Sequence, residues 1–186
     1  MRRPMQAPTP PGDRESFRLL RERPEDGAEV EWLLDLAFAP GRTALSSYRL
    51  RQGVAPVAGL CSVVRDELDV LAGCIRYWPV RIGTAGAPAL LLGPVAVHPT
   101  RQGEGIGALM LRETLADAAA LGWSRVVLIG DLPYYARWGF SREAASALQF
   151  PPPYNPDRLL GRPLTPGAFD ACSGLVGPWT IAAADD

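Results

Sequence analysis

The sequence predicts a single α/β domain in which a mixed, mostly antiparallel sheet is flanked by helices. Two apolar segments on either side of a short polar turn have the pattern of a β-hairpin. Further along, a nearly unbroken apolar strand leads directly into a long amphipathic helix and then into another apolar strand, which is typical of a β-α-β unit. The length of 186 residues fits one domain with a sizeable core.

The first half of the chain is expected to contain two helices followed by the hairpin. Proline in the first turn and acidic residues beside it (Pro24, Glu25, Asp26) mark the start of the first helix. Val30, Leu33, Leu34 and Ala37 then recur on one helical face. The expected elements are a strand at 17–20, helices at 24–39 and 43–51, and strands at 59–65 and 68–82.

The second half is expected to alternate strands and helices. Gly93 and Pro94 interrupt the strand at 89–97, and because proline cannot donate to a sheet ladder, a bulge or a parting of strands is predicted there. The helix at 105–121 ends at Gly122, a position that favours glycine. The remaining expected elements are a strand at 125–129, a short helix at 132–138, an irregular proline-rich segment from 151 and a last strand at 174–179.

Domain limits follow from composition. Residues 1–13 are proline-rich and predicted to be a flexible tail without the apolar stretch of a secretory signal. We assign 14–186 to the domain, with a core at 17–150 and a C-terminal extension at 151–186. A cytoplasmic location is the default expectation.

Composition excludes several classes of function. The net charge of −1 gives no reason to expect nucleic acid or an anionic membrane as a partner, and no apolar run is long enough to span a bilayer. The chain has 19 arginines and no lysine, which excludes Schiff-base catalysis. Three isolated cysteines and the single His98 argue against a metal site. His98 is expected to be a solvated or capping residue, with a role as a base the less favoured alternative.

A glycine-rich turn between the strand at 89–97 and the long helix is the most informative motif. It reads Gln102-Gly103-Glu104-Gly105-Ile106-Gly107. Glycines allow close approach of a ligand to the backbone, and the first N–H groups of a helix lack partners within the helix. Together with the helix dipole, they make an anion site suited to a pyrophosphate. The spacing is neither that of a dinucleotide fold nor that of a Walker loop, and on the glycines alone a plain structural turn is an equal alternative.

Two motifs in this order resemble those of the GCN5-related N-acetyltransferases. Residues 102–107 resemble that family's Q/R-x-x-G-x-G/A signature, and Tyr135 followed by Gly139-Phe140 resembles its second signature. The segment RERPED at 21–26 resembles the family's passage from first strand to first helix. The resemblance spans about 17–150. Gly130-Asp131 before a Tyr-Tyr pair, and PLTPGAFDACSGLV in the tail, resemble a bacterial branch of uncharacterised acetyltransferases whose acceptor is generally not assigned.

The resemblance implies a fold, an activity and a set of site residues. It implies the acyl-CoA N-acyltransferase fold and transfer of an acetyl group from acetyl-CoA, a co-substrate, to an amine without a metal. Tyr135 would be the general acid that protonates the leaving thiolate, and Arg101 would approach the phosphates or remain a solvated arginine. The residues expected to hold the pantetheine arm are Val95, Ala96 and Val97, and those expected around the pyrophosphate are Gln102, Gly103, Glu104, Gly105, Ile106, Gly107 and Ala108.

The general base is left open. The strand at 90–97 carries no carboxylate, although many members of the family place one there. Asp131 is the nearest acid, but a cap for the helix at 132–138 is the favoured role for it. A water chain, or an amine that arrives neutral, would remove the need for a base. A backbone N–H freed near Gly93 is the expected oxyanion donor.

The acceptor is expected to bind between the two N-terminal helices, the loop at 83–88 and the tail after Phe150. It is either a small molecule or a peptide with an amine, and arginines there would suit an acidic acceptor, although solvated arginines are the simpler explanation. Candidate side chains are Tyr48, Arg49, Arg51, Arg76, Tyr77, Trp78 and Arg81. Alternatives are a longer-chain acyl-CoA or acyl-carrier-protein donor, and a non-catalytic CoA sensor. A homodimer also stays open.

Overall fold

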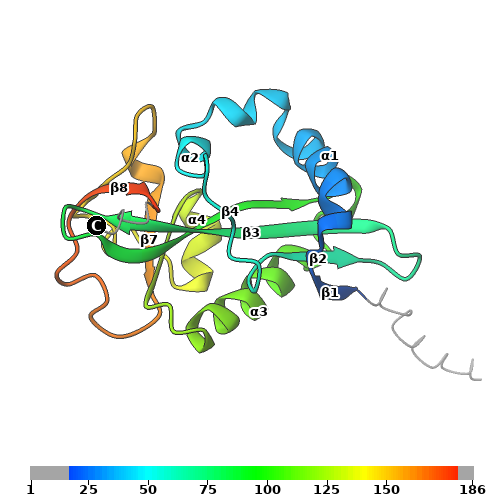
Figure 1. Ribbon diagram of the computed structural model, residues 1–186. Coiled ribbons are helices and arrows are strands. Elements are labelled where there is room, and N and C mark those ends of the chain that lie inside the picture. Colours follow the sequence, from blue (N-terminus) through cyan, green and yellow to red (C-terminus); the bar gives the residue numbers. More distant parts are fainter. Residues whose placement is uncertain (1–16, 180–186) are drawn as a thin grey trace, which may run out of the picture.

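Two long antiparallel strands, β3 (Leu71–Ile82) and β4 (Ala87–Val97), form the centre of the sheet in the computed structural model, which describes residues 17–179 (Figure 1). The sheet has eight strands in these residues, and its main order is β1-β2-β3-β4-β5-β7. The other strands are β1 (Arg18–Arg21), β2 (Ser62–Arg65), β5 (Arg125–Ile129), β6 (Leu148–Gln149), β7 (Leu159–Pro163) and β8 (Gly174–Pro178).

Helices cover both faces of the sheet. In Figure 1, α1 (Gly27–Phe38) and α2 (Ser46–Arg49) lie above the sheet, and α3 (Ile106–Ala120) lies below it. The short α4 (Leu132–Tyr135) follows β5. Short 3-10 helices lie at Pro24–Asp26, Pro40–Ala44, Pro99–Arg101, Ala136–Trp138 and Pro156–Arg158. The predicted fold class, an α/β domain with a mixed and mostly antiparallel sheet, is therefore confirmed.

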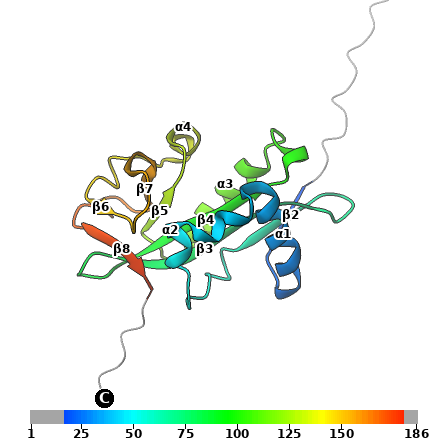
Figure 2. The same ribbon diagram turned by 90° about the horizontal axis from the view of Figure 1, so that it is seen from above.

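The long strand β3 joins the two halves of the sheet. One edge pairs with β4 along nearly its whole length, and the other edge pairs with β2 near its start and with β8 near its end. Figure 2 shows β1 and β2 at one end of the molecule and β5 to β8 at the other, with β3 and β4 running between them. The ends of this sheet are therefore held together by one hairpin.

The predicted interruption of β4 is confirmed. Ile75 pairs with Val95 and Tyr77 pairs with Leu92. Two residues of β4, Gly93 and Pro94, therefore lie opposite the single residue of β3 that separates Ile75 from Tyr77. On its other edge, β4 pairs in parallel with β5 only at Leu90 and Leu91. Beyond these pairs the two strands part, which leaves the later part of β4 available to line a site.

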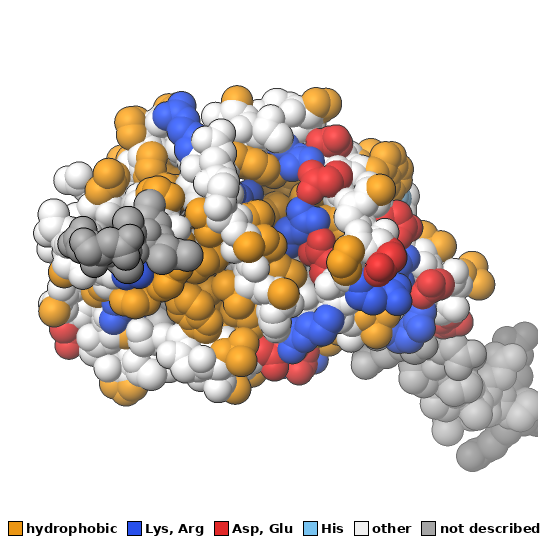
Figure 3. Space-filling view, viewed as in Figure 1, with side chains coloured by type: hydrophobic (Ala, Val, Ile, Leu, Met, Phe, Trp, Pro, Cys, Tyr) orange, Lys and Arg blue, Asp and Glu red, His pale blue; other side chains and the backbone are white. Residues whose placement is uncertain are grey.

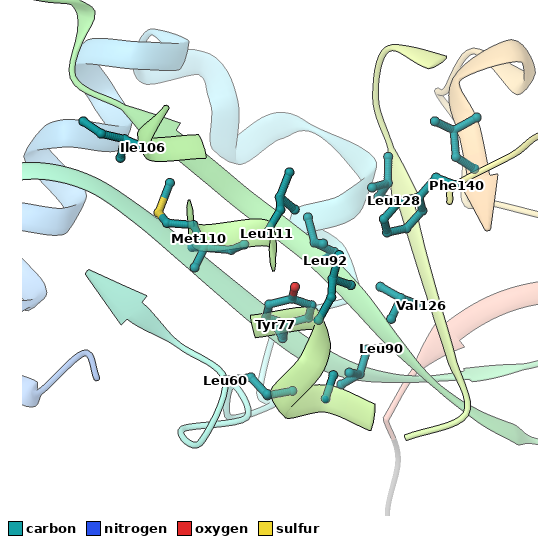
Figure 4. Packing of buried hydrophobic residues seen from close by; sticks show 14 of the residues in the cluster. Leu60, Tyr77, Leu90, Leu92, Ile106, Met110, Leu111, Val126, Leu128 and Phe140 are labelled. Atoms are coloured by element: carbon teal, nitrogen blue, oxygen red, sulfur yellow. The ribbon is translucent and has the colours of Figure 1, made fainter. Parts of the chain in front are cut away.

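The main core lies between the sheet and α3. Tyr77, Leu90, Ile106, Met110 and Leu111 are buried there and are seen packing together in Figure 4. The hydroxyl of the fully buried Tyr77 lies 2.9 Å from that of Thr114 on α3, which in turn donates to the carbonyl of Met110 at 2.7 Å. A second core lies under α1, where Val30, Leu33 and Leu34 are fully buried as the helical pattern predicted.

Some elements differ from those expected. The strand at 125–129 has the predicted limits, whereas the predicted helix at 43–51 is a 3-10 turn followed by the four residues of α2. The prediction that the chain is irregular after 151 is wrong, because β7 pairs with β5 over five residues. Gly161 and Pro163 disguise β7 in the sequence. The tail at 1–13 lies outside the described residues, and the division at 14 and 151 stays a prediction.

Candidate active site

The glycine turn precedes α3 and leaves the N-terminus of this helix open to a ligand. Gly103 and Gly105 have φ values of +88° and +84°, which side chains rarely tolerate, and Gly105 immediately precedes the helix. A Cβ added at either glycine would meet no atom within 4 Å, so the space above the turn is open. The first-turn N–H groups at Ile106, Gly107 and Ala108 have no partner within the helix. Backbone donors, open space and the helix dipole thus coincide at one place, as a pyrophosphate requires.

A cavity of about 440 Å³, here called the turn cavity, lies against this turn. It is lined by Val95, Val97, Arg101, Gln102, Gly103, Gly105, Ile106, Gly107, Ala108, Tyr134, Tyr135 and Arg137. Of the residues proposed from sequence for the cofactor, Ala96 and Glu104 do not line it. Ala96 is buried under α1, because alternate residues of β4 face opposite sides of the sheet.

Arg101 is held in place by acidic neighbours. Its guanidinium lies 2.9 Å from Asp66 and 3.6 Å from Glu104. The N–H of Val70, together with Arg101, holds the pKa of Asp66 below its usual value. Arg101 is therefore a partly exposed arginine held by two acids, and its proposed contact with a cofactor phosphate stays a prediction.

Two adjacent tyrosines of α4 border the turn cavity. The hydroxyl of Tyr134 would be 2.5 Å from a Cβ at Gly107, so the absence of a side chain at Gly107 lets this phenol reach the first turn of α3. The ring of Tyr135 packs in the same way on Gly130 and edge-on against Phe140, with ring centroids 5.7 Å apart. Burial raises the pKa of Tyr135 to about 12 and also raises that of Tyr134.

A second cavity, of about 290 Å³ and here called the α2 cavity, opens beside α2. It is lined by Phe38, Arg42, Leu45, Ser47, Tyr48, Arg51, Leu91, Leu92, Gly93, Pro94, Val95, Ile129, Gly130, Asp131, Tyr134, Tyr135 and Arg158. Val95, Tyr134 and Tyr135 line both cavities. The two spaces therefore meet at the parted end of β4 and at the two phenols.

The α2 cavity includes only part of the region in which the acceptor is expected to bind. The N-terminal helices and Arg158 from the tail contribute to it, but the loop at 83–88 does not. Tyr77 is buried in the core, and Arg49 donates instead to the carbonyl of Pro152. Arg81 donates to the carbonyl of Gly86. Among the predicted candidates, only Tyr48 and Arg51 line the cavity, a distinction that required knowing how the strands are oriented.

An ion-pair network supports the wall formed by the N-terminal helices. Glu31 on α1 accepts from Arg42 at 2.5 Å and from Arg76 at 2.6 Å, and Arg76 also binds Glu22. Although burial raises the pKa of Glu31, the hydrogen bonds from Arg76 and Arg42 lower it below its usual value. Figure 3 shows acidic and basic side chains alternating over the face that carries α1, next to a hydrophobic area. Arg42 is therefore already neutralised by acids.

Asp131 is the only carboxylate among the described residues that line either cavity. It precedes α4, where its backbone carbonyl accepts from the N–H groups of Tyr134 and Tyr135. Its side chain makes no cap and instead lies 3.1 Å from Arg158, 74% exposed. Asp131 therefore occupies the N-cap position of α4 as expected, although its carboxylate makes no capping hydrogen bond.

The remaining reactive side chains lie elsewhere. His98 stacks on Trp32 and its Nδ1 lies 2.8 Å from the hydroxyl of Thr100, so it lines neither cavity. The three cysteines are buried, and burial raises the pKa of Cys61 to about 11 and that of Cys74 to about 12. Within residues 17–179 there is no group of three or more His, Cys, Asp or Glu residues that could hold a metal. No helix in this range could cross a membrane.

Comparison with known proteins agrees with this geometry. The family model described as an acetyltransferase (GNAT) domain matches residues 58–142. The uncharacterised N-acetyltransferase YhbS of Escherichia coli is 26% identical over 155 residues, which cover 83% of this chain and 92% of YhbS. A crystal structure of E. coli YhbS in complex with CoA has a TM-score of 0.76 at 25% identity, covering 93% of this chain and 94% of that one.

A second solved structure is more similar in sequence. A GNAT family acetyltransferase from Brucella melitensis, in complex with acetyl-CoA, is 30% identical with a TM-score of 0.66, and the match covers 92% of this chain and 99% of that one. The fold and the open glycine turn define an acyltransferase that uses acyl-CoA. The chain belongs to the GNAT family of N-acetyltransferases. The residues at its turn fit CoA because the turn is open and rich in free backbone donors.

Proposed function

We propose that the protein transfers the acetyl group of acetyl-CoA directly to the amine of an acceptor in the α2 cavity, with Tyr135 as the general acid. The observation that carries this proposal is the meeting of the two cavities at Val95, Tyr134 and Tyr135. A donor held at the glycine turn and an acceptor held beside α2 would face each other there, and orientation of two bound substrates supplies much of the rate in such reactions.

The residues at the turn have roles that follow from their backbone geometry. The N–H groups of Gln102, Gly103, Glu104, Gly105, Ile106, Gly107 and Ala108 are proposed to hold the pyrophosphate, and the backbone of Val95, Ala96 and Val97 the pantetheine arm. Since backbone groups make these contacts, Ala96 and Glu104 can contribute although their side chains do not line the cavity. Arg101 is proposed to approach the phosphates from the position that Asp66 fixes. When bound, acetyl-CoA supplies the activated acyl group.

The two phenols are suited to giving a proton and not to taking one. With its pKa raised to about 12, Tyr135 stays protonated at neutral pH and can donate to a thiolate within reach. It is correspondingly a poor acceptor. The one carboxylate at the cavities, Asp131, is exposed and paired with Arg158. We therefore propose that the acceptor amine arrives neutral or loses its proton to water.

The test compares two neighbouring phenols. Tyr135→Phe should lower kcat by about 10²-fold or more, the usual contribution of a general acid, and should leave CoA affinity unchanged. Tyr134→Phe is the matched control and should have the milder effect on kcat. The measurements are thiol release over an amine panel and calorimetric titration with CoA. Full activity of Tyr135→Phe would refute the general-acid role, and a loss confined to Tyr134→Phe would assign that role to Tyr134.

The same assays separate the alternative functions. Faster thiol release from longer acyl-CoA donors, or transfer only from an acyl carrier protein, would replace acetyl-CoA as the donor. CoA binding without turnover on any amine would indicate a sensor. The location in the cytoplasm, the homodimer and the domain limits of 14–186 stay predictions.

A further inference from the structure

Arg51, which follows α2, lines the α2 cavity without an acidic partner. Its Nε and Nη1 atoms are fully buried and have no hydrogen-bond partner within residues 17–179. The guanidinium carbon lies 4.4 Å from the centre of the Tyr48 ring and 5.7 Å from that of Trp78. Aromatic faces attract the cation but do not accept its N–H bonds as a carboxylate does.

The other arginines of this region are paired with carboxylates. Arg42 binds Glu31 and Asp35, Arg76 binds Glu22 and Glu31, and Arg158 binds Asp131. These four carboxylates, Glu22, Glu31, Asp35 and Asp131, are thus each already paired with an arginine. A buried charge without a partner is costly, and a perturbed charged group at a cavity is a candidate for a functional site.

Arg51 remains charged at neutral pH despite its burial. Desolvation lowers its pKa to about 10, which is still well above neutrality. The guanidinium therefore places a positive charge at the wall of the cavity, and two of its nitrogen atoms have no hydrogen-bond partner among the described residues. Such a group matches a carboxylate, which accepts two N–H bonds in one plane.

Arg51 places its positive charge near the point where the two cavities meet. Its Nη2 would be 3.6 Å from a Cβ at Gly93, which places it beside the bulge of β4. Val95, where the two cavities meet, is two residues further along that strand. A cavity of about 290 Å³ is close to the lower end of the range for small-molecule sites.

From this geometry we propose that the acceptor is a small amine that also carries a carboxylate, as an amino acid does, and that Arg51 binds the carboxylate while the amine lies at Val95 and Tyr135. The proposal rests on the proposed function, since it assigns the α2 cavity to the acceptor.

The experiment uses matched acids and amides. The probes are glycine, β-alanine, 4-aminobutanoate and leucine, each with its primary amide, which removes the charge and keeps the shape. For at least one pair, the wild-type protein should bind the acid at least about tenfold more tightly than the amide in a calorimetric titration at saturating CoA. The same preference should appear in kcat/KM for thiol release.

Variants then assign the preference to Arg51. Arg51→Met should bring the acid and amide affinities to within about twofold of each other with CoA affinity unchanged, and Arg51→Lys should keep part of the preference. Arg49→Met is the control, because Arg49 is exposed, two residues away and outside the cavity. Equal binding of acid and amide in every wild-type pair overturns the inference, and so does a preference that survives in Arg51→Met.

Failure of the proposed function would give results different from those that overturn the role of Arg51. If no amine gives thiol release, acetyl transfer to this panel is refuted, while the acid and amide titrations still decide whether Arg51 binds a carboxylate. If neutral amines are acetylated as fast as their acidic counterparts, the acetyl transfer stands and the assignment of Arg51 falls. The wild-type comparison needs no variant to fold.

Discussion

Gly107 offers the sharpest test of how α4 meets α3. In Gly107→Ala the new Cβ would lie 2.5 Å from the Tyr134 hydroxyl, about 0.9 Å closer than the 3.4 Å at which ordinary contact begins. The next nearest atoms, Cζ of Tyr134 and Cγ2 of Val97, are at 3.8 and 3.9 Å and would not interfere. The whole conflict thus comes from one oxygen atom, and Tyr134→Phe removes that atom alone.

The expected free-energy changes determine whether Gly107→Ala stabilises or destabilises the protein, with Tyr134 and with Phe at position 134. Alanine in place of glycine stabilises a helix by up to about 1 kcal/mol, whereas overpacking costs about 1–3 kcal/mol. Gly107→Ala should therefore destabilise the wild-type protein by about 1 kcal/mol and stabilise Tyr134→Phe by about 0.5 kcal/mol. Because the displaced phenol borders the turn cavity, the single variant should also bind CoA more weakly, and the double variant should recover.

The assay is a double-mutant cycle measured by urea unfolding, with CoA titration on the same four proteins. A coupling free energy of about 1.5 kcal/mol is expected between the two positions. If Gly107→Ala changes the free energy of unfolding and the CoA affinity by the same amounts with Tyr134 and with Phe at 134, the phenol does not lie over the helix terminus. The position of both tyrosines relative to the turn would then be wrong.

Three further perturbations address the turn and the fold. Gly105→Asp should abolish CoA binding in a folded protein, because the new carboxylate would meet the pyrophosphate. Gly105→Asn is the control: it must adopt the same positive φ but adds no charge, so it should still bind CoA measurably. Equal CoA affinities of the two variants by calorimetry would show that the turn is only structural. Arg101→Ala should weaken CoA more than dephospho-CoA if Arg101 meets the 3′-phosphate, with Arg112→Ala as control, and equal losses for both ligands would reject the contact. Hydrogen bonds from the Arg23 N–H and from Arg65 outweigh burial and lower the pKa of Asp26, so its contribution is complete above the unfolded pKa of 3.8 and is lost as the pH falls below it. Urea unfolding should accordingly show Asp26→Asn to be about 2 kcal/mol less stable at neutral pH, the usual contribution of hydrogen bonds to a charged group, and nearly equal to the wild type in strong acid. A difference that does not vary with pH would contradict this.

The sequence predicted the elements whose signals are local. The face of α1 follows from the spacing of Val30, Leu33 and Leu34, and the bulge follows from Gly93-Pro94 within an apolar strand. The glycine turn was recognisable because its chemistry is carried by consecutive residues. Their backbone conformation in the structure, with Gly103 and Gly105 at positive φ, matches what that chemistry needs.

What the sequence could not supply are relations between distant segments. β7 owes its place to pairing with β5, a contact that no local pattern announces. Ala96 was assigned to the cofactor together with its neighbours, but the alternation along β4 turns its side chain toward α1. Asp131 has the sequence position of a cap, yet Arg158 from the tail takes its carboxylate. In each of these cases a partner more than 20 residues away determines where the strand or the side chain lies.

The same reasoning explains why arginine could not be assigned from composition. Seven side chains near the expected acceptor region were equal candidates in the sequence, and four of them were arginines. What separates Arg51 from Arg76 is the set of acids around them: the hairpin and α1 bring Glu22 and Glu31 to Arg76, whereas no described carboxylate is hydrogen-bonded to Arg51. An unpaired charge is a property of the folded neighbourhood and not of the residue. If Arg51 binds the carboxylate of the acceptor as proposed, specificity for the acceptor follows from how the N-terminal helices pair their other charges.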